Sequence, residues 1–323
     1  MPSPRKYSVG VDLGGTNLRA VAVSDDARVL GKISGDTNLS AGRDAVIMDM
    51  VNAIQKLSSA CGGGDLAGVG VAVPGFIDMK RGFIVGSNNL PQFERFPIRD
   101  EMTRLLAKPV ILENDANAAA MGERWLGAGR EVDDLVLLTL GTGIGGGIIL
   151  GGKIFHGALG MAGEFGHMTG FSGGNPCGCG NQGCLEKHAS ATAISAMARL
   201  MQLGEGLPAR EVFRIATEET GDRQLRASRI FEKVGEALGI AIANLVNIFN
   251  VPLYLLSGGP LPAWDLFAPA MLDEVKRRSF TFRNSKTRIE RAALGHEAGM
   301  FGAAYLPLAG QVLLPHHLEI EEN

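Results

Sequence analysis

The chain has 323 residues, of which 46% are hydrophobic and 20% are charged, and its formal net charge is −3. This length can bury a large core and predicts two lobes rather than one. The slight negative charge does not favour nucleic acid or an anionic membrane as a partner. The N-terminus has no apolar signal region and no apolar run reaches membrane-spanning length, so we expect a cytoplasmic protein.

A glycine turn follows the first predicted strand. Residues 7–13 form a short β-prone run that ends in the sequence DLGGTNLR, and residues 20–23 resume an apolar strand pattern, which predicts a hairpin. A glycine pair lets backbone N–H groups approach a phosphate. Asp12, at the end of the strand, could hold a phosphate-bound Mg²⁺ through water. A tight turn with a solvated aspartate is the alternative.

A predicted helix over residues 45–60 and a second strand over 68–73 come next. The strand is ended by Pro74 and Gly75. Residues 87–91, with the sequence SNNLP, form a polar loop whose amide side chains suit hydroxyl recognition. On this segment alone, an ordinary Asn-rich turn is the favoured interpretation.

The third predicted strand, residues 109–112, runs into Glu113, Asn114 and Asp115, and an alanine-rich helix follows over 116–126. Open α/β sheets place ligand chemistry at this end of a strand. The Asp115 carboxylate would also be a good helix N-cap, worth about 1 kcal/mol. The segment alone leaves catalysis and capping equally open.

A second glycine hairpin is predicted in the middle of the chain. A strand over residues 134–139 enters the run GTGIGGG (141–147), and residues 148–150 return as a strand. This repeats the first hairpin, so we infer a diverged internal duplication with phosphates held between the two turns.

The segment 157–186 combines a histidine, cysteines and two carboxylates between glycines. The spacing of four side chains matches the tetrahedral ligands that zinc takes: His167, Cys177, Cys179 and Cys184. Glu164 and Glu186 lie on either side of these ligands. The sequence therefore predicts a zinc-bound loop that also carries polar groups toward a ligand.

Buried thiols, or one disulfide with a spare cysteine, are the alternative for this loop. A Cys-x-Cys pair is too close for an ordinary disulfide, and the chain has only four cysteines and no export signal. The fourth cysteine, Cys61, is far away in the sequence and is expected to be a small buried or loop residue.

The C-terminal part is predicted to be mostly helical. Apolar residues at helical spacing over 231–249 indicate a core helix, and residues 251–256 form a strand that ends in a third glycine turn at Gly258 and Gly259. The basic segment 276–291 could be a nucleic-acid patch, but the negative net charge favours a solvated helix end and strand.

The last predicted element is a small-residue helix over 298–304 that packs closely against a neighbour. The polar residues 316–323 are expected to fray.

Together these motifs resemble the ROK family (repressors, open reading frames, kinases), which includes bacterial sugar kinases. The resemblance spans almost the whole chain and is carried by DLGGT (12–16), ENDAN (113–117), GTGIGGG (141–147), GEFGH (163–167), CGCGNQGCLE (177–186) and LSGG (256–259). It implies an actin-like, hexokinase-type α/β fold of two lobes with ligands in the cleft between them. We expect residues 1–115, completed by the C-terminal helix at about 298–323, to form the small lobe. Residues 116–297 would form the large lobe with the zinc loop.

The resemblance also implies roles for single residues. Asp115 would be the general base on the sugar hydroxyl. The sugar would be bound by Asn114, Asp115, Glu164, His167 and Glu186, with Gly75 and Asn89 nearby. ATP, with Mg²⁺ at Asp12, would be bound by the turns at Gly14, Gly15, Thr16, Thr142, Gly143, Gly258 and Gly259.

The activity implied is ATP-dependent phosphorylation of a hexose at its 6-hydroxyl. Glucose is the first candidate substrate, and N-acetylglucosamine or N-acetylmannosamine is next; fructose, and polyphosphate in place of ATP, rank lower. A sugar-sensing repressor of the same family would carry a helix-turn-helix domain before the Asp-Gly-Gly motif, for which we expect no room ahead of Asp12. Dimers are usual in the family, so we expect a homodimer or a higher homo-oligomer.

The residue types suit this chemistry. A carboxylate that takes the proton of a sugar hydroxyl contributes roughly 10²- to 10⁴-fold to the rate. Carboxylates repel anions, which places Glu164 and Glu186 on the sugar side. Four protein ligands would close the coordination of zinc, so the metal is expected to be structural. His167 would bind it with one ring nitrogen and leave the other for the sugar.

Overall fold

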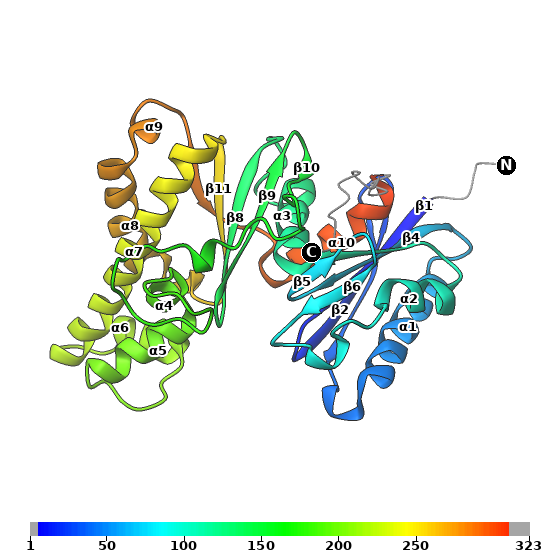
Figure 1. Ribbon diagram of the computed structural model, residues 1–323, viewed down its shortest axis with the longest axis horizontal. Helices are drawn as coiled ribbons and strands as arrows, with labels where there is room; N and C mark the ends of the chain where they lie inside the picture. Colours follow the sequence, from blue (N-terminus) through cyan, green and yellow to red (C-terminus); the bar gives the residue numbers. More distant parts are fainter. Residues whose placement is uncertain (1–5, 310–323) are drawn as a thin grey trace, which may run out of the picture. The chain divides into compact units, whose positions relative to one another are not determined.

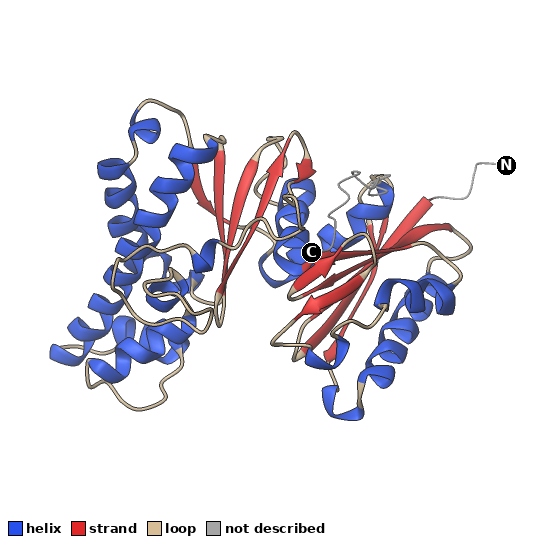
Figure 2. Cartoon of the chain, viewed as in Figure 1, coloured by secondary structure: helices blue, strands red, loops and turns tan. Residues whose placement is uncertain are grey.

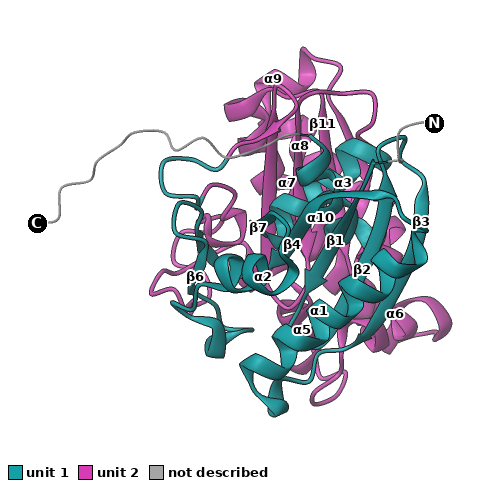
Figure 3. Ribbon diagram, turned by 90° about the vertical axis from the view of Figure 1, so that its right-hand side faces the viewer, with its two compact units in different colours: residues 1–126, 156–161, 297–323 teal, residues 127–155, 162–296 magenta. Residues whose placement is uncertain are grey.

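The structure is a computed structural model that describes residues 6–309 (Figure 1). Its contacts divide the chain into two compact units (Figure 3). Unit 1 comprises the described residues up to Leu126, residues 156–161, and the described residues from Glu297 onward. Unit 2 comprises residues 127–155 and 162–296.

Both units contain strands and helices (Figure 2). The strands are β1 (Lys6–Leu13), β2 (Asn17–Ser24), β3 (Val29–Asp36), β4 (Asp65–Val73), β5 (Phe76–Asp78), β6 (Phe83–Gly86), β7 (Val110–Asn114), β8 (Leu135–Leu140), β9 (Ile144–Leu150), β10 (Lys153–Ile154), β11 (Leu253–Gly258) and β12 (Arg288–Arg291). The helices are α1 (Arg43–Ala60), α2 (Ile98–Leu106), α3 (Asp115–Leu126), α4 (Glu186–Ala189), α5 (Ala191–Leu200), α6 (Ala209–Glu218), α7 (Asp222–Phe249), α8 (Trp264–Arg278), α9 (Phe280–Arg283) and α10 (Ala298–Leu308). None of the helices within residues 6–309 is both long and apolar enough to cross a membrane.

The two five-stranded sheets have the same plan. Their orders are β3-β2-β1-β4-β7 and β10-β9-β8-β11-β12. In each sheet the first three strands are antiparallel to their neighbours, and the last three run parallel. The two glycine hairpins, β1–β2 and β8–β9, therefore belong to two sheets of the same topology. The internal duplication predicted this repeat.

Helices cover both faces of the unit 1 sheet. Apolar residues of α1 and α2 pack with Val9 and Val11 of β1 on one face. On the other face, α10 packs directly against glycines of the sheet. A Cβ on Gly10 would lie 2.0 Å from the Met300 carbonyl oxygen, so the close approach requires glycine there. The prediction of a closely packed small-residue helix at 298–304 is confirmed.

The expected lobe boundary at residue 115 falls at the first residue of α3. In the structure α3 stays with unit 1, because its Ala118 carbonyl lies 1.7 Å from where a Cβ on Gly302 of α10 would be. Only glycine allows this approach. The expected lobe segment from residue 310 on, and the expected fraying of 316–323, lie outside the described residues.

The core of unit 2 is built around α7. Its stripe from Phe231 to Leu245 is buried, as the helical spacing predicted. Glycines let α8 approach it closely, since a Cβ on Gly235 would lie 2.1 Å from the Phe267 carbonyl oxygen.

The basic segment 276–291 forms the end of α8, the short α9 and β12. Arg277 and Arg278 both pair with Glu274, and Arg291 pairs with Asp265 at 2.9 Å. Acidic neighbours thus offset these charges, which favours the interpretation as a solvated helix end and strand.

Candidate functional site

The first glycine turn of unit 1 is held by its own backbone and by Thr37. The Gly14 N–H donates to the Asn17 carbonyl (2.8 Å), and the Thr37 N–H donates to the Thr16 carbonyl (2.9 Å). A Cβ on Gly15 would lie 3.3 Å from the Asn89 carbonyl oxygen. The structure therefore brings the predicted phosphate turn and the predicted hydroxyl-binding loop side by side.

Asp12 lies at the end of β1, over the first turn of α10. A Cβ on Gly299 would be 3.1 Å from its carboxylate, and Arg19 Nη1 lies 3.9 Å from its Oδ2. The positive end of a helix favours a carboxylate. Asp12 is thus kept at the strand end where a cation bound to phosphate was expected.

The corner between β7 and α3 shows which side chain caps the N-terminus of α3. Asn114 Oδ1 accepts hydrogen bonds from the N–H groups of Ala116 (2.9 Å) and Asn117 (3.1 Å). Asn114 therefore caps α3. Asp115 is the first helical residue, and its Oδ1 also accepts from Ala116 N–H (2.9 Å). Capping thus does not require the Asp115 carboxylate.

Gly75 lies beside this corner. Asn114 Nδ2 donates to the Gly75 carbonyl (3.2 Å). Gly75 has φ +112°, and a Cβ there would lie 2.4 Å from the Gly86 carbonyl oxygen, so only glycine is tolerated. Three residues predicted for the sugar, Gly75, Asn114 and Asp115, are therefore neighbours.

A buried carboxylate supports the same corner, and the sequence motif assigned it no role. Glu113 is 2% exposed, and its Oε1 accepts from the Asn114 N–H (2.9 Å) and from Asn117 Nδ2 (3.1 Å). Its Oε2 lies 2.7 Å from His156 Nε2. A glutamate at the end of an apolar strand signals a buried partner, but no spacing points to His156.

Burial opposes the charged form of His156, yet its hydrogen bond with Glu113 and the charge of that carboxylate outweigh burial. The pKa of His156 is therefore raised. The contact with Glu113 thus favours the protonated imidazole of His156.

The second and third glycine turns meet in unit 2. The Gly141 N–H donates to the Gly143 carbonyl (2.9 Å), and the Thr142 carbonyl accepts from Thr192 Oγ1 (2.7 Å). Gly258 has φ +112°, and a Cβ there would lie 1.9 Å from the Leu140 carbonyl oxygen. The turns predicted to bind ATP in this unit are thus adjacent.

Close packing on β9 positions Glu164 and His167. A Cβ on Gly163 would lie 2.4 Å from the Gly146 carbonyl oxygen, and one on Gly166 would lie 2.1 Å from that of Ile144. His167 Nε2 lies 4.0 Å from Glu164 Oε2. Burial raises the pKa of Glu164.

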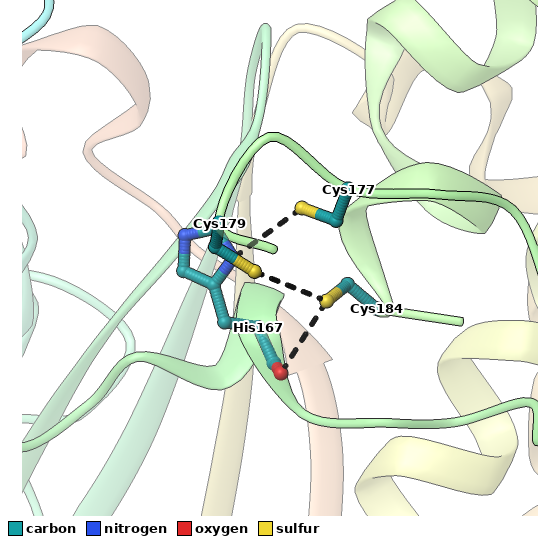
Figure 4. Close-up of side chains that lie close together, drawn as sticks. All are labelled: His167, Cys177, Cys179 and Cys184. Atoms are coloured by element: carbon teal, nitrogen blue, oxygen red, sulfur yellow. Dashed lines mark hydrogen bonds between the residues drawn. The ribbon is translucent and has the colours of Figure 1, made fainter. Parts of the chain in front are cut away.

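The four predicted metal ligands converge (Figure 4). Their ligand atoms all lie within 4.8 Å of one another. Cys177 Sγ is 3.7 Å from His167 Nδ1, and Cys179 Sγ is 3.7 Å from Cys184 Sγ. A tetrahedron with zinc–ligand bonds of about 2.0–2.3 Å has edges of about 3.6–3.8 Å, so these residues fit a metal such as zinc. All four cysteines are free thiols in the structure, which excludes the disulfide alternative for this loop.

Glu186, the first residue of α4, connects this cluster with the second glycine turn. Its Oε1 accepts from the Cys177 thiol (3.2 Å), and a Cβ on Gly143 would lie 2.7 Å from its Oε2. Cys61 is separate from this cluster: it is half-buried at the C-terminus of α1, where its thiol donates to the Leu57 carbonyl (3.2 Å).

Each unit therefore assembles its share of the predicted residues. Unit 1 carries Asp12, Gly14, Gly15, Thr16, Gly75, Asn89, Asn114 and Asp115. Unit 2 carries Thr142, Gly143, Glu164, His167, Cys177, Cys179, Cys184, Glu186, Gly258 and Gly259.

Residues 8–309 match the ROK family, and the chain belongs to that family. It is 34% identical over 318 residues to a glucokinase from Halalkalibacterium halodurans, covering 93% of this chain and 94% of the relative. Its structure is similar to that of a ROK hexokinase from Thermus thermophilus, with a TM-score of 0.83 and 35% identity over 94% of this chain and 99% of the other. It is also similar to a ROK family glucokinase from Streptomyces griseus in complex with glucose and AMPPNP. That match has a TM-score of 0.74 and 30% identity, and covers 93% of this chain and 98% of the other.

The predicted two-lobed, actin-like ATPase fold is thereby confirmed. The chain is thus a ROK protein with the fold of the ROK hexokinases.

Proposed function

We propose that this chain is an ATP-dependent hexokinase that transfers the γ-phosphoryl group of ATP to the 6-hydroxyl of glucose. The observation that carries the proposal is the corner at the end of β7, where Asn114 caps α3 and Asp115 is the first helical residue. The similarity to proteins named glucokinase, one of them in complex with glucose and AMPPNP, supports the choice of substrates.

In this mechanism Asp115 is the general base. Its carboxylate accepts the proton of the sugar hydroxyl as the oxygen attacks phosphorus, which contributes roughly 10²- to 10⁴-fold to the rate. Asn114 and Asn89 hold neighbouring hydroxyls, and the fixed backbone at Gly75 keeps the Asn114 amide in place. This pre-set geometry lowers the entropy that the reacting groups must lose.

The glycine turns hold the nucleotide. Backbone N–H groups at Gly14, Gly15 and Thr16 in unit 1, and at Thr142 and Gly143 in unit 2, would donate to phosphate oxygens, and Gly258 and Gly259 would lie along the nucleotide. Asp12 would hold Mg²⁺ through water. The cation, when bound, offsets the charge on the transferring phosphoryl group.

In unit 2, the residues that would bind the sugar are Glu164, His167 and Glu186. Carboxylates accept hydrogen bonds from several hydroxyls and repel phosphate, so Glu164 and Glu186 suit a polyol. His167 presents Nδ1 to the cysteine cluster and has Nε2 on the side of Glu164. That arrangement leaves Nε2 available for a sugar hydroxyl.

We propose that the cluster of His167, Cys177, Cys179 and Cys184 binds a structural zinc ion. Three thiolates and one imidazole are a set of donors that zinc prefers, and four protein ligands leave no open position for catalysis. The metal would hold the loop that carries Glu164, His167 and Glu186. Metal analysis of the purified protein should give about one zinc per chain.

A coupled assay with MgATP across glucose, N-acetylglucosamine, N-acetylmannosamine, mannose and fructose tests the function. We expect glucose to have the highest kcat/KM. A higher value with an N-acetylhexosamine would move the substrate to that class, and turnover of none of the sugars would refute the proposal. Replacement of ATP by polyphosphate in the same assay tests the phosphoryl donor.

We further propose that units 1 and 2 are the two lobes of the kinase and that the protein is a homodimer or a higher homo-oligomer, as the family resemblance implies. We also propose that the protein is cytoplasmic. Sedimentation velocity of the purified chain should give the mass of a dimer or of a larger assembly. A species of 34.0 kDa would contradict this.

A further inference from the structure

The buried carboxylate of Glu113 has no part in the mechanism above, although it immediately precedes the Asn114–Asp115 pair. With 2% exposure it cannot touch a sugar or a nucleotide. An ionised carboxylate is costly to bury unless its oxygens are paired. Three hydrogen-bonding groups surround the Glu113 carboxylate, and their arrangement needs an explanation.

Two of these donors define the corner on which Asp115 lies. Glu113 Oε1 accepts from the backbone N–H of Asn114 (2.9 Å) and from the side chain of Asn117 (3.1 Å). Asn117 also donates its own backbone N–H to Asn114 Oδ1 (3.1 Å). Glu113, Asn114 and Asn117 thus form a closed set of hydrogen bonds around Asp115.

The third donor comes from far along the chain. His156 is the first residue of the segment 156–161 that belongs to unit 1, and its Nε2 lies 2.7 Å from Glu113 Oε2. The His156 side chain is 18% exposed. An imidazole here compensates the buried charge and leaves Oε1 free to hold the corner.

We infer that Glu113 is a positioning residue for the proposed base Asp115, and that His156 acts through Glu113 by keeping its carboxylate in place. This inference rests on the proposed function, because Asp115 matters only if it meets a sugar hydroxyl. A displacement of about 1 Å at a reacting group can cost about 10²-fold in rate. Loss of the Glu113 contacts should therefore lower kcat and leave the KM for glucose nearly unchanged.

The test compares Glu113→Gln, His156→Gln and the double variant. We expect kcat to fall about tenfold to a hundredfold in Glu113→Gln, with the KM for glucose within about threefold. If His156 acts through Glu113, the double variant should lose no more than Glu113→Gln alone, because coupled residues are not additive.

Lys32→Gln is the matched control. Lys32 pairs at 2.7 Å with Glu297, which is likewise the first residue of a segment that belongs to unit 1, but this pair does not touch the β7–α3 corner. We expect its kcat to stay within about twofold of the unaltered protein, as for a surface ion pair.

Amide hydrogen exchange of the peptide 113–118 gives a readout that does not need activity. Exchange should rise in Glu113→Gln and in His156→Gln and stay unchanged in Lys32→Gln. If the unaltered protein phosphorylates no sugar, the proposed function fails, while the exchange data still decide whether Glu113 holds the corner. If Glu113→Gln does not fold, His156→Gln carries both measurements.

Three outcomes would overturn the inference. The first is a folded Glu113→Gln with unchanged kcat or unchanged exchange. The second is a double variant whose losses multiply. The third is a fall in kcat that only follows a fall in melting temperature, with KM rising in parallel.

Discussion

The β7–α3 corner of unit 1 and the cysteine loop of unit 2 hold their functional side chains by different means. The corner uses a strand, a helix and a buried carboxylate whose donors are mostly within four residues. The cysteine loop, residues 162–185, contains only a three-residue 3₁₀ helix (Phe165–His167) and isolated bridges. A segment with so little regular structure needs another constraint, and four converging ligands provide one.

The comparison has a practical consequence. The corner should respond to changes of charge or of hydrogen-bonding groups, and the loop should respond to removal of metal. Both support residues proposed for the same reaction, so the two responses can be separated by their effects on kcat and on KM.

Removal of the base should have the largest effect. Asp115→Asn keeps the size of the side chain but cannot accept the hydroxyl proton, so we expect kcat to fall roughly 10²- to 10⁴-fold with a folded protein. Steady-state kinetics with glucose measures this. Asp44→Asn, at an exposed carboxylate in the first turn of α1, is the control. Wild-type turnover in Asp115→Asn would rule out the mechanism.

Chelation should affect the loop and spare the corner. Removal of the metal, or Cys184→Ser, should raise the KM for glucose about tenfold or more, since a hydrogen bond to a charged group contributes about 1.5–3 kcal/mol. The melting temperature should fall as well. Cys61→Ser, outside the cluster, should change neither value. A metal-free protein with unchanged KM would show that the loop does not depend on the metal.

A single methyl group can test the contact between the loop and the second glycine turn. In Gly143→Ala the new Cβ would lie 2.7 Å from Glu186 Oε2, so the carboxylate must move. We expect the KM for glucose to rise about threefold to tenfold, the size of one ordinary hydrogen bond. Gly35→Ala, where a Cβ meets no atom within 4 Å, is the control. An unchanged KM would mean that Glu186 does not contact the sugar.

The smallest expected effect concerns pH and the corner. The pKa of His156 is raised in the folded state, so its protonated form stabilises the fold. This contribution is fully present below the unfolded pKa of about 6.5 and is lost as pH rises through the folded pKa. The melting temperature of the unaltered protein should therefore fall more between about pH 6 and about pH 9 than that of His156→Gln. Parallel curves for the two proteins would contradict the ionised pair.

Much of the fold could be predicted because its signals are local. The strand over residues 7–13 and the helix over 45–60 appear within a few residues of their expected bounds. The apolar stripe over 231–249 lies in α7, which begins earlier, at Asp222. The two glycine turns in the sequence predicted the repeated sheet topology. The edge strand β3 was missed, since its exposed positions carry no apolar alternation.

The candidate site was predicted unevenly for the same reason. The metal ligands depend on spacing within 18 residues, which the sequence displays directly. The capping of α3 by Asn114 instead of Asp115 depends on backbone geometry at one turn. The partner of Glu113 depends on a contact 43 residues away.

By itself, the sequence determined the family motifs, the candidate ligands of a metal and the candidates for base and phosphate binding, because these depend on residue type and short spacing. Only the tertiary structure decided that α3 packs with α10 in unit 1, and that His156 meets the buried carboxylate of Glu113. Contacts of this kind form between segments far apart in the chain, and no local pattern of residues records which segments will meet.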